Sequence, residues 1–306
     1  MMPALVTQLF DYVRERHPRT LRGVEEAREI APERFDEMTE MFLGWLARAR
    51  GAEAIPATVD SFVRFTTAVN LAQARYDADG HYENRSFAEL YANHYSQNET
   101  MTDYLWGVYL TNFLWAHHVE ISLFYRDSFL ARMAPDAQLV EIAPGHGGWG
   151  AWALSVLQQA RLKGYDISPS SIQIARTMIR AAGLEGRAEY EERNALELPD
   201  SLANTADGVV CCFLAEHLER PGELLAGIQK VLKPRSIAFV TSVLTAAQVD
   251  HIYEFRYESE IVKLCEENGL RALATLSAGP KRMLPRGRFL PRSMALILQK
   301  RTQETF

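Results

Sequence analysis

The chain has 306 residues, of which 47% are hydrophobic and 24% charged, and its formal net charge at pH 7 is −6. This composition fits one large or two modest globular domains and excludes low-complexity and strongly charged disordered proteins. An acidic balance argues against a dominant nucleic-acid surface, and the apolar runs are too short to span a bilayer. Because the start of the chain also lacks a signal-peptide pattern, we expect a cytoplasmic protein without nucleic-acid or membrane partners.

The first 133 residues show helical periodicity and almost no strand signal. We predict five helices, separated by prolines and glycines, at 2–16, 32–50, 56–77, 84–95 and 100–133. The last of them is unusually aromatic, which indicates burial on more than one side. We therefore expect an all-helical domain over residues 1–133.

From residue 134 onward, predicted strands alternate with predicted helices. The strands are at 138–143, 162–166, 188–191, 207–213, 236–242, 271–277 and 293–299. The helices are at about 148–159, 169–182, 222–232 and 256–268. This alternation is typical of a mostly parallel sheet covered on both faces. The expected fold class over 134–306 is therefore α/β, a doubly wound, seven-stranded, Rossmann-like sheet.

The segment from Leu139 to Gly150 carries the clearest chemical signal. An apolar run ends in Glu141, a glycine-rich turn follows at Gly145 and Gly147, and a helical pattern then begins. Strand, glycine turn and helix form a nucleotide-binding unit, because glycines let the backbone approach a ligand and the helix terminus offers unpaired N–H groups. Gly145, Gly147 and Gly150 also satisfy the dinucleotide pattern G-x-G-x-x-G, so this unit fits a dinucleotide or S-adenosylmethionine (SAM).

Glu141 favours SAM over a dinucleotide. An acid at the end of this strand repels a pyrophosphate, since like charges in a semi-buried site are costly. SAM has no phosphate, and a nearby acid attracts its ammonium and sulfonium groups. Asp166, at the end of the next strand, suits the two ribose hydroxyls as a charge-assisted acceptor. NAD enzymes place an acid similarly, so Asp166 alone does not discriminate between the two ligands.

Six short motifs follow one another between residues 141 and 234. They are Glu-Ile-Ala-Pro-Gly-His-Gly-Gly (141–148), Gly-Tyr-Asp-Ile-Ser-Pro (164–169), Ile-Ala-Arg (174–176), Arg-Asn-Ala (193–195), Ala-Glu-His-Leu-Glu-Arg-Pro (215–221) and Val-Leu-Lys-Pro (231–234). In this order they make residues 139–242 resemble the class I SAM-dependent methyltransferases. The resemblance implies SAM as cofactor and S-adenosylhomocysteine (SAH) as product.

The resemblance also implies roles for individual residues. The turn at Gly145 and Gly147 is expected to support the methionyl part of SAM, and Asp166 is expected to bind the ribose. The adenine is expected to contact Ile167 and the edge formed by Asn194 and Ala195, and Leu214 is expected near the sulfonium. Two positions depart from the family pattern. Ala143 replaces the first glycine of the turn, which is tolerable if its φ is negative, and Asn194 stands where an acid is common.

The helical segment before residue 134 lies outside the resemblance. By position it looks like the variable cap that many small-molecule methyltransferases place over the site. We therefore expect a small organic acceptor, or a carrier-bound or peptide-bound one, methylated on oxygen rather than carbon, in specialised metabolism. A basic stretch at 281–288, continued by Arg292, suits an acidic carrier, although a solvated loop is the simpler interpretation. A homodimer is left open.

Three residues are candidates for action on the acceptor. A hydroxyl or acidic-carbon acceptor must lose a proton, which calls for a base with a pKa near neutral. His217 is the leading candidate because its motif places it near the methyl group, and Tyr95 is suited to orient an acceptor. His118 is the third, but it points about 100° away from His117, so at most one of the two is expected to face a pocket. Glu216 is predicted to be a surface or capping residue.

The remaining polar signals are weaker. His146, inside the glycine turn, either faces the ligand or is exposed. The three cysteines show no metal-ligand spacing, and no metal is expected. Two alternatives stay open: an NAD-dependent dehydrogenase that uses the same glycine turn, and a non-catalytic SAM-binding regulator. The second stays open because methyl transfer requires no obligatory catalytic residue.

Overall fold

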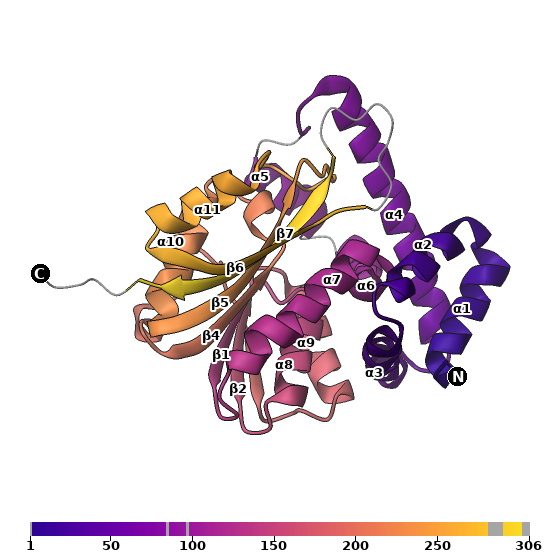
Figure 1. Ribbon diagram of the computed structural model, residues 1–306, viewed down its shortest axis with the longest axis horizontal. Coiled ribbons are helices and arrows are strands. Elements are labelled where there is room, and N and C mark those ends of the chain that lie inside the picture. The colour runs from indigo at the N-terminus through magenta and orange to yellow at the C-terminus, as the bar shows by residue number, and fades with distance from the viewer. Residues whose placement is uncertain (1, 84–85, 96–97, 281–289, 302–306) are drawn as a thin grey trace, which may run out of the picture.

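A computed structural model describes residues 2–83, 86–95, 98–280 and 290–301, without the side chains of residues 93 and 94 (Figure 1). Within this part of the chain, seven strands form one sheet in the order β3-β2-β1-β4-β5-β7-β6. Their bounds are β1 Gln138–Ile142, β2 Arg161–Asp166, β3 Ala188–Glu192, β4 Ala206–Cys212, β5 Leu232–Leu244, β6 Leu270–Ala278 and β7 Arg292–Lys300. Strands β1 to β5 pair in parallel, and β7 runs antiparallel to β5 and β6. The predicted sheet is confirmed.

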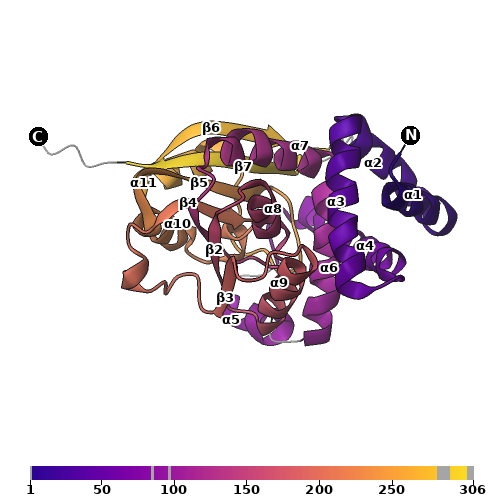
Figure 2. The ribbon, with the colours of Figure 1, turned by 90° about the horizontal axis from the view of Figure 1, so that it is seen from below.

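Helices cover both faces of this sheet, as the nearly continuous burial of its central strands requires. α8 (Gly148–Val156) and α9 (Pro169–Ala181) pack on one face, and α10 (Pro221–Val231) and α11 (Glu258–Glu267) on the other. α7 (Ala116–Phe124) completes the first face by packing against β6 and β7 (Figure 2). Strand order reverses between β1 and β4, which creates the edge where doubly wound sheets bind their ligands.

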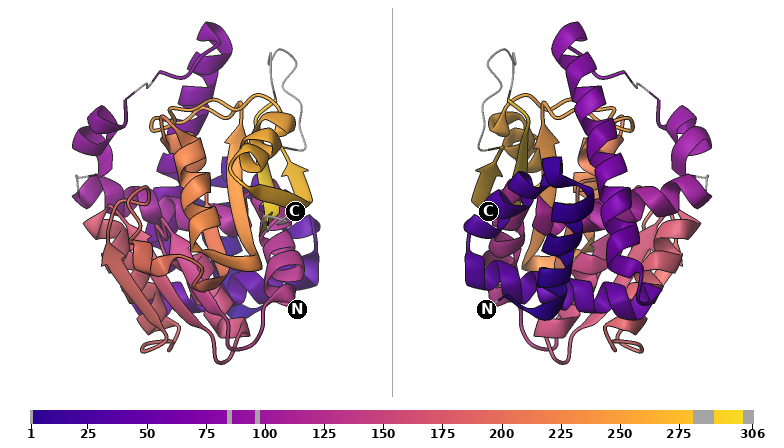
Figure 3. Two further views of the ribbon diagram at one scale, coloured as in Figure 1. Left: turned by 90° about the vertical axis from the view of Figure 1, so that its left-hand side faces the viewer. Right: turned by 90° about the vertical axis from the view of Figure 1, so that its right-hand side faces the viewer.

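The N-terminal helices form a separate layer beside the sheet, which Figure 3 shows from its right-hand side. They are α1 Ala4–Arg16, α2 Pro18–Glu29, α3 Pro32–Arg50, α4 Ala54–Asp79, α5 Phe87–Leu90 and α6 Asn98–Leu114. One hydrophobic cluster runs through this layer into the sheet. For example, the Phe42 ring of α3 lies 5.6 Å from both Tyr109 of α6 and Trp152 of α8, between ring centroids. The proposed boundary near residue 133 stays a prediction.

Three helix predictions in this layer differ from the structure. The expected helix over 100–133 breaks at Trp115, whose backbone is extended at φ −102° and ψ 123°. α6 is apolar on nearly all sides, so its hydrophobic pattern does not predict the residue at which the helix ends. α2 was missed, although Pro18 occupies a first-turn position that suits proline. Of the expected helix over 84–95, the described residues 86–95 form only α5 and a short π-helical turn at Tyr91–Tyr95.

Two further observations bear on the class of protein. No helix in the described ranges has the length and apolar character needed to cross a membrane. The three cysteines are free thiols, with Cys211 and Cys265 buried and Cys212 partly buried.

Candidate active site

A cavity of about 650 Å³ opens at the carboxyl ends of β1, β2 and β4, where strand order reverses. Its volume lies within the range of about 300–1,000 Å³ that is common for small-molecule sites. Eight of the nine predicted cofactor residues line it: Glu141, Ala143, Gly145, Asp166, Ile167, Asn194, Ala195 and Leu214. The N-terminal helices supply the opposite wall, so residues from both parts of the chain enclose one space.

Gly147 is the exception among the predicted residues. It does not line the cavity but caps the start of α8 with a left-handed φ of +71°. A Cβ at this position would lie 2.6 Å from the Cα of Ala175 in α9. Gly147 therefore allows α8 and α9 to approach each other, and its effect on a ligand is indirect.

Ala143 does not have the negative φ that would make it a tolerable replacement for glycine. Its φ is +53°, in the left-handed region that favours glycine, rather than negative. Phe213 and Thr245 follow β4 and β5 with φ values of +52° and +51°. Each such conformation costs about 1–3 kcal/mol in a residue with a side chain, and strain of this kind is concentrated at functional sites. Three neighbouring strands thus end in strained residues at the edge that forms the cavity.

Glu141 is buried beneath the glycine turn. Its Oε1 accepts a hydrogen bond of 3.0 Å from the Gly150 N–H, and the Tyr190 hydroxyl donates to its Oε2 at 3.3 Å. Burial raises the pKa of Glu141 to about 8 in the absence of a ligand, although these hydrogen bonds oppose the shift. The carboxyl group is therefore mostly protonated at pH 7, and a bound cationic ligand would favour its ionised form.

Asp166 joins the ends of β1 and β2. Its two carboxylate oxygens accept hydrogen bonds from the Ser168 N–H at 2.9 Å and the Gly145 N–H at 3.2 Å. Burial raises its pKa to about 6, against the opposing effect of these hydrogen bonds. Asp166 therefore both shapes the glycine turn and presents an acceptor to the cavity. Together with Glu141 and a turn that passes through Gly145, it suits a ligand with hydroxyl and cationic groups, as SAM has.

Two polar residues, Asn194 and His146, line the cavity at the cofactor wall and are also held by local hydrogen bonds. Asn194 uses both of its amide groups locally, since Oδ1 accepts from Leu196 N–H at 3.0 Å and Nδ2 donates to Glu197 at 3.3 Å. An adenine edge would have to compete with these bonds. His146 is buried rather than exposed, and it contacts Gly148 N–H and Asn112 of α6, each at 3.0 Å. It links the glycine turn to the N-terminal layer.

Both His117 and His118 line the cavity, so the expectation that at most one does so is wrong. They lie in the first turn of α7, and the cavity extends around that end of the helix. The ring nitrogens of His118 lie 3.2 Å from Thr111 Oγ1 and 3.3 Å from Ser293 Oγ. Burial holds its pKa well below the ordinary value, and that of His117 at about 4. His118 is therefore a neutral residue whose two nitrogens already have partners.

His217 and Tyr95 meet at the far wall of the cavity. The Tyr95 hydroxyl lies 3.0 Å from His217 Nδ1 and donates to Asp250 Oδ2 at 3.2 Å. The Asp250 carboxylate is itself 3.5 Å from the same ring nitrogen. Burial raises the pKa of Tyr95 well above its ordinary value, so its hydroxyl acts as a hydrogen-bond donor. The structure brings two of the three predicted acceptor residues into direct contact.

Three further residues at this wall were missed or misjudged from the sequence. Glu216 is fully buried rather than at the surface, and Asp250 and His251 lie in the loop between β5 and α11. α4 holds this loop, because Ala247 N–H donates to Gln73 at 2.9 Å. The adjacent acid and histidine at 216 and 217 offered a signal, whereas the loop near residue 250 has no recognisable pattern.

Comparison with known proteins identifies a methyltransferase domain within the chain. Residues 139–235 match the family model of a methyltransferase domain. Over 107 residues the chain is 26% identical to erythromycin 3''-O-methyltransferase of Saccharopolyspora erythraea. This stretch is 35% of either protein, so the chain spans about a third of the length of this curated relative.

Solved structures support the fold. An O-methyltransferase family protein from Burkholderia thailandensis has a TM-score of 0.55 at 16% identity, over 80% of this chain and 72% of that chain. A geranyl diphosphate methyltransferase in complex with SAM has a TM-score of 0.50 at 12% identity, over 72% of this chain and 98% of that chain. The match to a methyltransferase domain argues against the alternative of an NAD-dependent dehydrogenase. Residues 139–235 therefore form a SAM-dependent methyltransferase domain, with S-adenosylmethionine as its cofactor.

Proposed function

We propose that this protein methylates a hydroxyl group of a small organic acceptor, in the cytoplasm and in specialised metabolism. One observation carries the proposal: a single cavity holds the cofactor residues on one side and a buried wall of histidines and aromatic rings on the other. Two of the similar proteins are named as O-methyltransferases, which supports oxygen as the methylated atom. The three free thiols fit a reducing compartment.

The cofactor wall is proposed to act mainly by alignment. Bound SAM supplies an electrophilic methyl group on a sulfonium, so the protein must hold the acceptor at attack distance. Asp166 would accept hydrogen bonds from the ribose, and Glu141, in its ionised form, would favour the positive charge of the ligand. The turn that passes through Ala143 and Gly145 would fix the methionyl part.

The acceptor wall is apolar and aromatic, which favours a compact acceptor over a macromolecular surface. Phe213 stacks on His118 with ring centroids 4.9 Å apart, and Trp115 stacks on His117 at 5.4 Å. The carrier-bound alternative rests on the basic stretch at 281–288, which lies outside the described residues. Arg292, its continuation, forms an ion pair of 2.9 Å with Glu258.

His217 is the residue best placed to receive the proton of an acceptor hydroxyl. It lines the cavity, and Asp250 is positioned to orient its ring and to stabilise its charged form. His118 suits this role less, because burial strongly disfavours its protonated form and both ring nitrogens have partners.

The test is calorimetric titration of the purified protein with SAM, SAH and NAD. We expect micromolar binding of the two sulfur ligands. Asp166→Ala should weaken it at least about 100-fold, because two charge-assisted hydrogen bonds are lost. Asp136→Ala, at an exposed acid outside the cavity, is the matched control. Binding of NAD alone would overturn the proposal.

A screen of hydroxylated acceptors, read by SAH formation and by mass gain of the acceptor, tests turnover. Tight SAM binding without methylation of any hydroxyl, amine or carbon acceptor would instead favour the non-catalytic regulator.

A further inference from the structure

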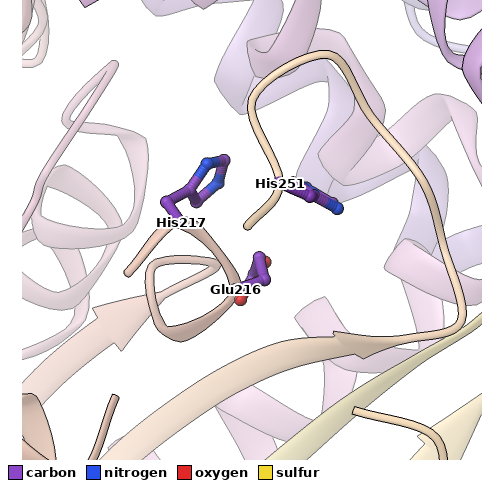
Figure 4. Close-up of side chains that lie close together, drawn as sticks. All are labelled: Glu216, His217 and His251. Atoms are coloured by element: carbon purple, nitrogen blue, oxygen red, sulfur yellow. The ribbon is translucent and has the colours of Figure 1, made fainter. Parts of the chain in front are cut away.

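Four buried polar residues gather at the wall of the cavity that faces the acceptor. Glu216 and His217 form the turn after β4, and His251 belongs to the loop that follows β5 (Figure 4). Asp250 precedes His251 in the same loop. None of the four is more than 8% exposed. The backbone N–H of Ile252 donates to the Glu216 carbonyl oxygen at 2.8 Å, so the two loops are fixed to each other.

Three of these side chains have the composition and spacing of a metal site. One carboxylate oxygen of Glu216 and one ring nitrogen each of His217 and His251 lie within 4.8 Å of one another. Oxygen and nitrogen ligands bind a divalent cation at about 2.0–2.2 Å, so opposite ligands of one ion are at most about 4.4 Å apart. A small rotation of these side chains would therefore bring all three atoms onto one ion.

Two buried carboxylate oxygens here lack a hydrogen-bond partner. Ser242 donates to Glu216 Oε2 at 2.8 Å, but Glu216 Oε1 has no partner, and neither has Asp250 Oδ1. An unsatisfied buried polar group costs about 1–3 kcal/mol, and more when it is charged. Among the ion pairs of the described residues, none joins a lysine or arginine to either carboxylate. A cation at this place would give the unpaired Glu216 oxygen the partner that it lacks.

The hydrogen bonds of the two histidines leave a metal-binding nitrogen on each. His251 Nδ1 lies 2.7 Å from the Ala246 carbonyl oxygen, and His217 Nδ1 lies 3.0 Å from that of Asp250. Because a carbonyl oxygen only accepts, Nδ1 carries the hydrogen in both rings and Nε2 keeps its lone pair. Metal-bound histidines characteristically donate their other nitrogen to a carbonyl or carboxylate in this way.

We propose that Glu216, His217 and His251 bind one divalent transition-metal cation in the acceptor wall. Two imidazoles and one carboxylate suit Zn²⁺ and its first-row neighbours better than Mg²⁺, which favours oxygen ligands. Three protein ligands leave coordination positions open. Its role rests on the proposed function: an acceptor hydroxyl would bind the cation through oxygen and release its proton to water. His217 would then be a ligand, and its role as a base would be confined to the metal-free protein.

The experiment uses the untagged full-length chain, freed of metal with a chelator. It is titrated calorimetrically with Zn²⁺, Mn²⁺ and Mg²⁺, and with SAH in parallel. We expect one Zn²⁺ per chain, bound at least about tenfold more tightly than Mg²⁺. Glu216→Gln and His251→Gln should each weaken Zn²⁺ binding at least about tenfold. His81→Gln changes an exposed histidine outside the cavity and should leave binding unchanged.

Two results would overturn the cation site: no saturable binding of any of the three cations to the wild-type chain, or Zn²⁺ binding that both variants retain. The wild-type titration alone decides the question if a variant does not fold. SAH binding in the same samples separates the proposals, because its persistence without cation binding rejects the metal site and leaves the cofactor assignment intact.

Discussion

The two sides of the cavity are built in different ways. The cofactor side comes from turns that directly follow β1, β2 and β3, and it uses backbone groups, buried acids and a glycine with a positive φ. The acceptor side combines α6, α7, the turn after β4 and the loop after β5. A site made of backbone turns requires particular residues at fixed spacing, whereas a site made of side chains requires only that the fold brings them together. Only the first leaves a continuous sequence pattern.

The His217→Asn variant tests most directly whether the cofactor side and the acceptor side of the cavity act independently. We expect SAH affinity to stay within about twofold, because the His217 side chain is not among the predicted cofactor contacts. Turnover of an acceptor found by screening should fall by about 10²–10⁴, the range for loss of a group that assists proton removal. Calorimetry and steady-state kinetics on the same preparation measure the two effects. A parallel loss of SAH affinity would show that the sides are not independent.

Gly150→Ala should damage the cofactor side. An added Cβ would lie 2.3 Å from Glu141 Oε2, within a buried hydrogen-bonded pair. We expect a loss of about 3 kcal/mol in the free energy of unfolding, and SAH binding weakened at least about tenfold. Gly227→Ala is the matched control, since its Cβ would meet only the Ala195 carbonyl oxygen at 3.9 Å. Denaturant unfolding compares the two, and equal stabilities would reject this role of Gly150.

SAH affinity should depend on pH through Asp166. Its pKa is raised to about 6 in the free protein, chiefly by burial, and the ribose hydroxyls would favour its ionised form. The contribution of Asp166 to the affinity is therefore expected to be fully present above pH 6 and to fall as the pH drops through 6, by up to about tenfold per unit. Ionisation of Glu141, whose pKa is about 8, is expected to add a separate rise toward pH 8. Calorimetry between pH 5 and 8 measures this slope. Asp166→Asn should bind weakly and without this dependence, and an unchanged slope would assign it to another group.

The smallest effect is expected from Ala143→Gly. A glycine relieves the strain of a φ of +53°, although it also increases the entropy of the unfolded chain. The net gain in the free energy of unfolding should be about 1 kcal/mol, with SAH affinity unchanged or improved. Thermal unfolding with and without SAH measures it. A destabilised variant would indicate that the left-handed conformation of Ala143 carries no strain.

The sheet was predictable because hydrophobic runs of strand length alternate with amphipathic helices. All seven predicted strands are present, and their ends differ from the observed ones mostly by one or two residues. The largest difference is β5, which begins at Leu232 rather than at residue 236, because backbone pairing continues past Pro234 at an irregular register. The break at Trp115 was not predictable, since the flanking helices are apolar on several sides.

The acceptor wall was only partly predictable. The motif around residues 215–221 indicated His217, but it did not predict that Glu216 is buried. The burial of Glu216 results from its contacts with β5 and with the loop that follows β5. His251 is separated from His217 by α10, the whole of β5 and the first part of the loop that follows β5. Its place depends on α4 and the residues just after it, which fix that loop through Gln73 and Tyr82. Such a meeting of side chains is a property of the folded chain rather than of any local segment.

One hydrophobic cluster runs from the N-terminal helices into the sheet, and it limits how this fold can diversify in evolution. α3 packs on α9, where Arg48 donates to the Ala181 carbonyl oxygen at 2.6 Å, and α7 covers β6 and β7. A chimaera that receives a foreign helical segment would have to match these buried faces as well as the acceptor. New acceptor ranges are therefore expected to arise by point substitutions around the cavity rather than by exchange of the whole N-terminal layer.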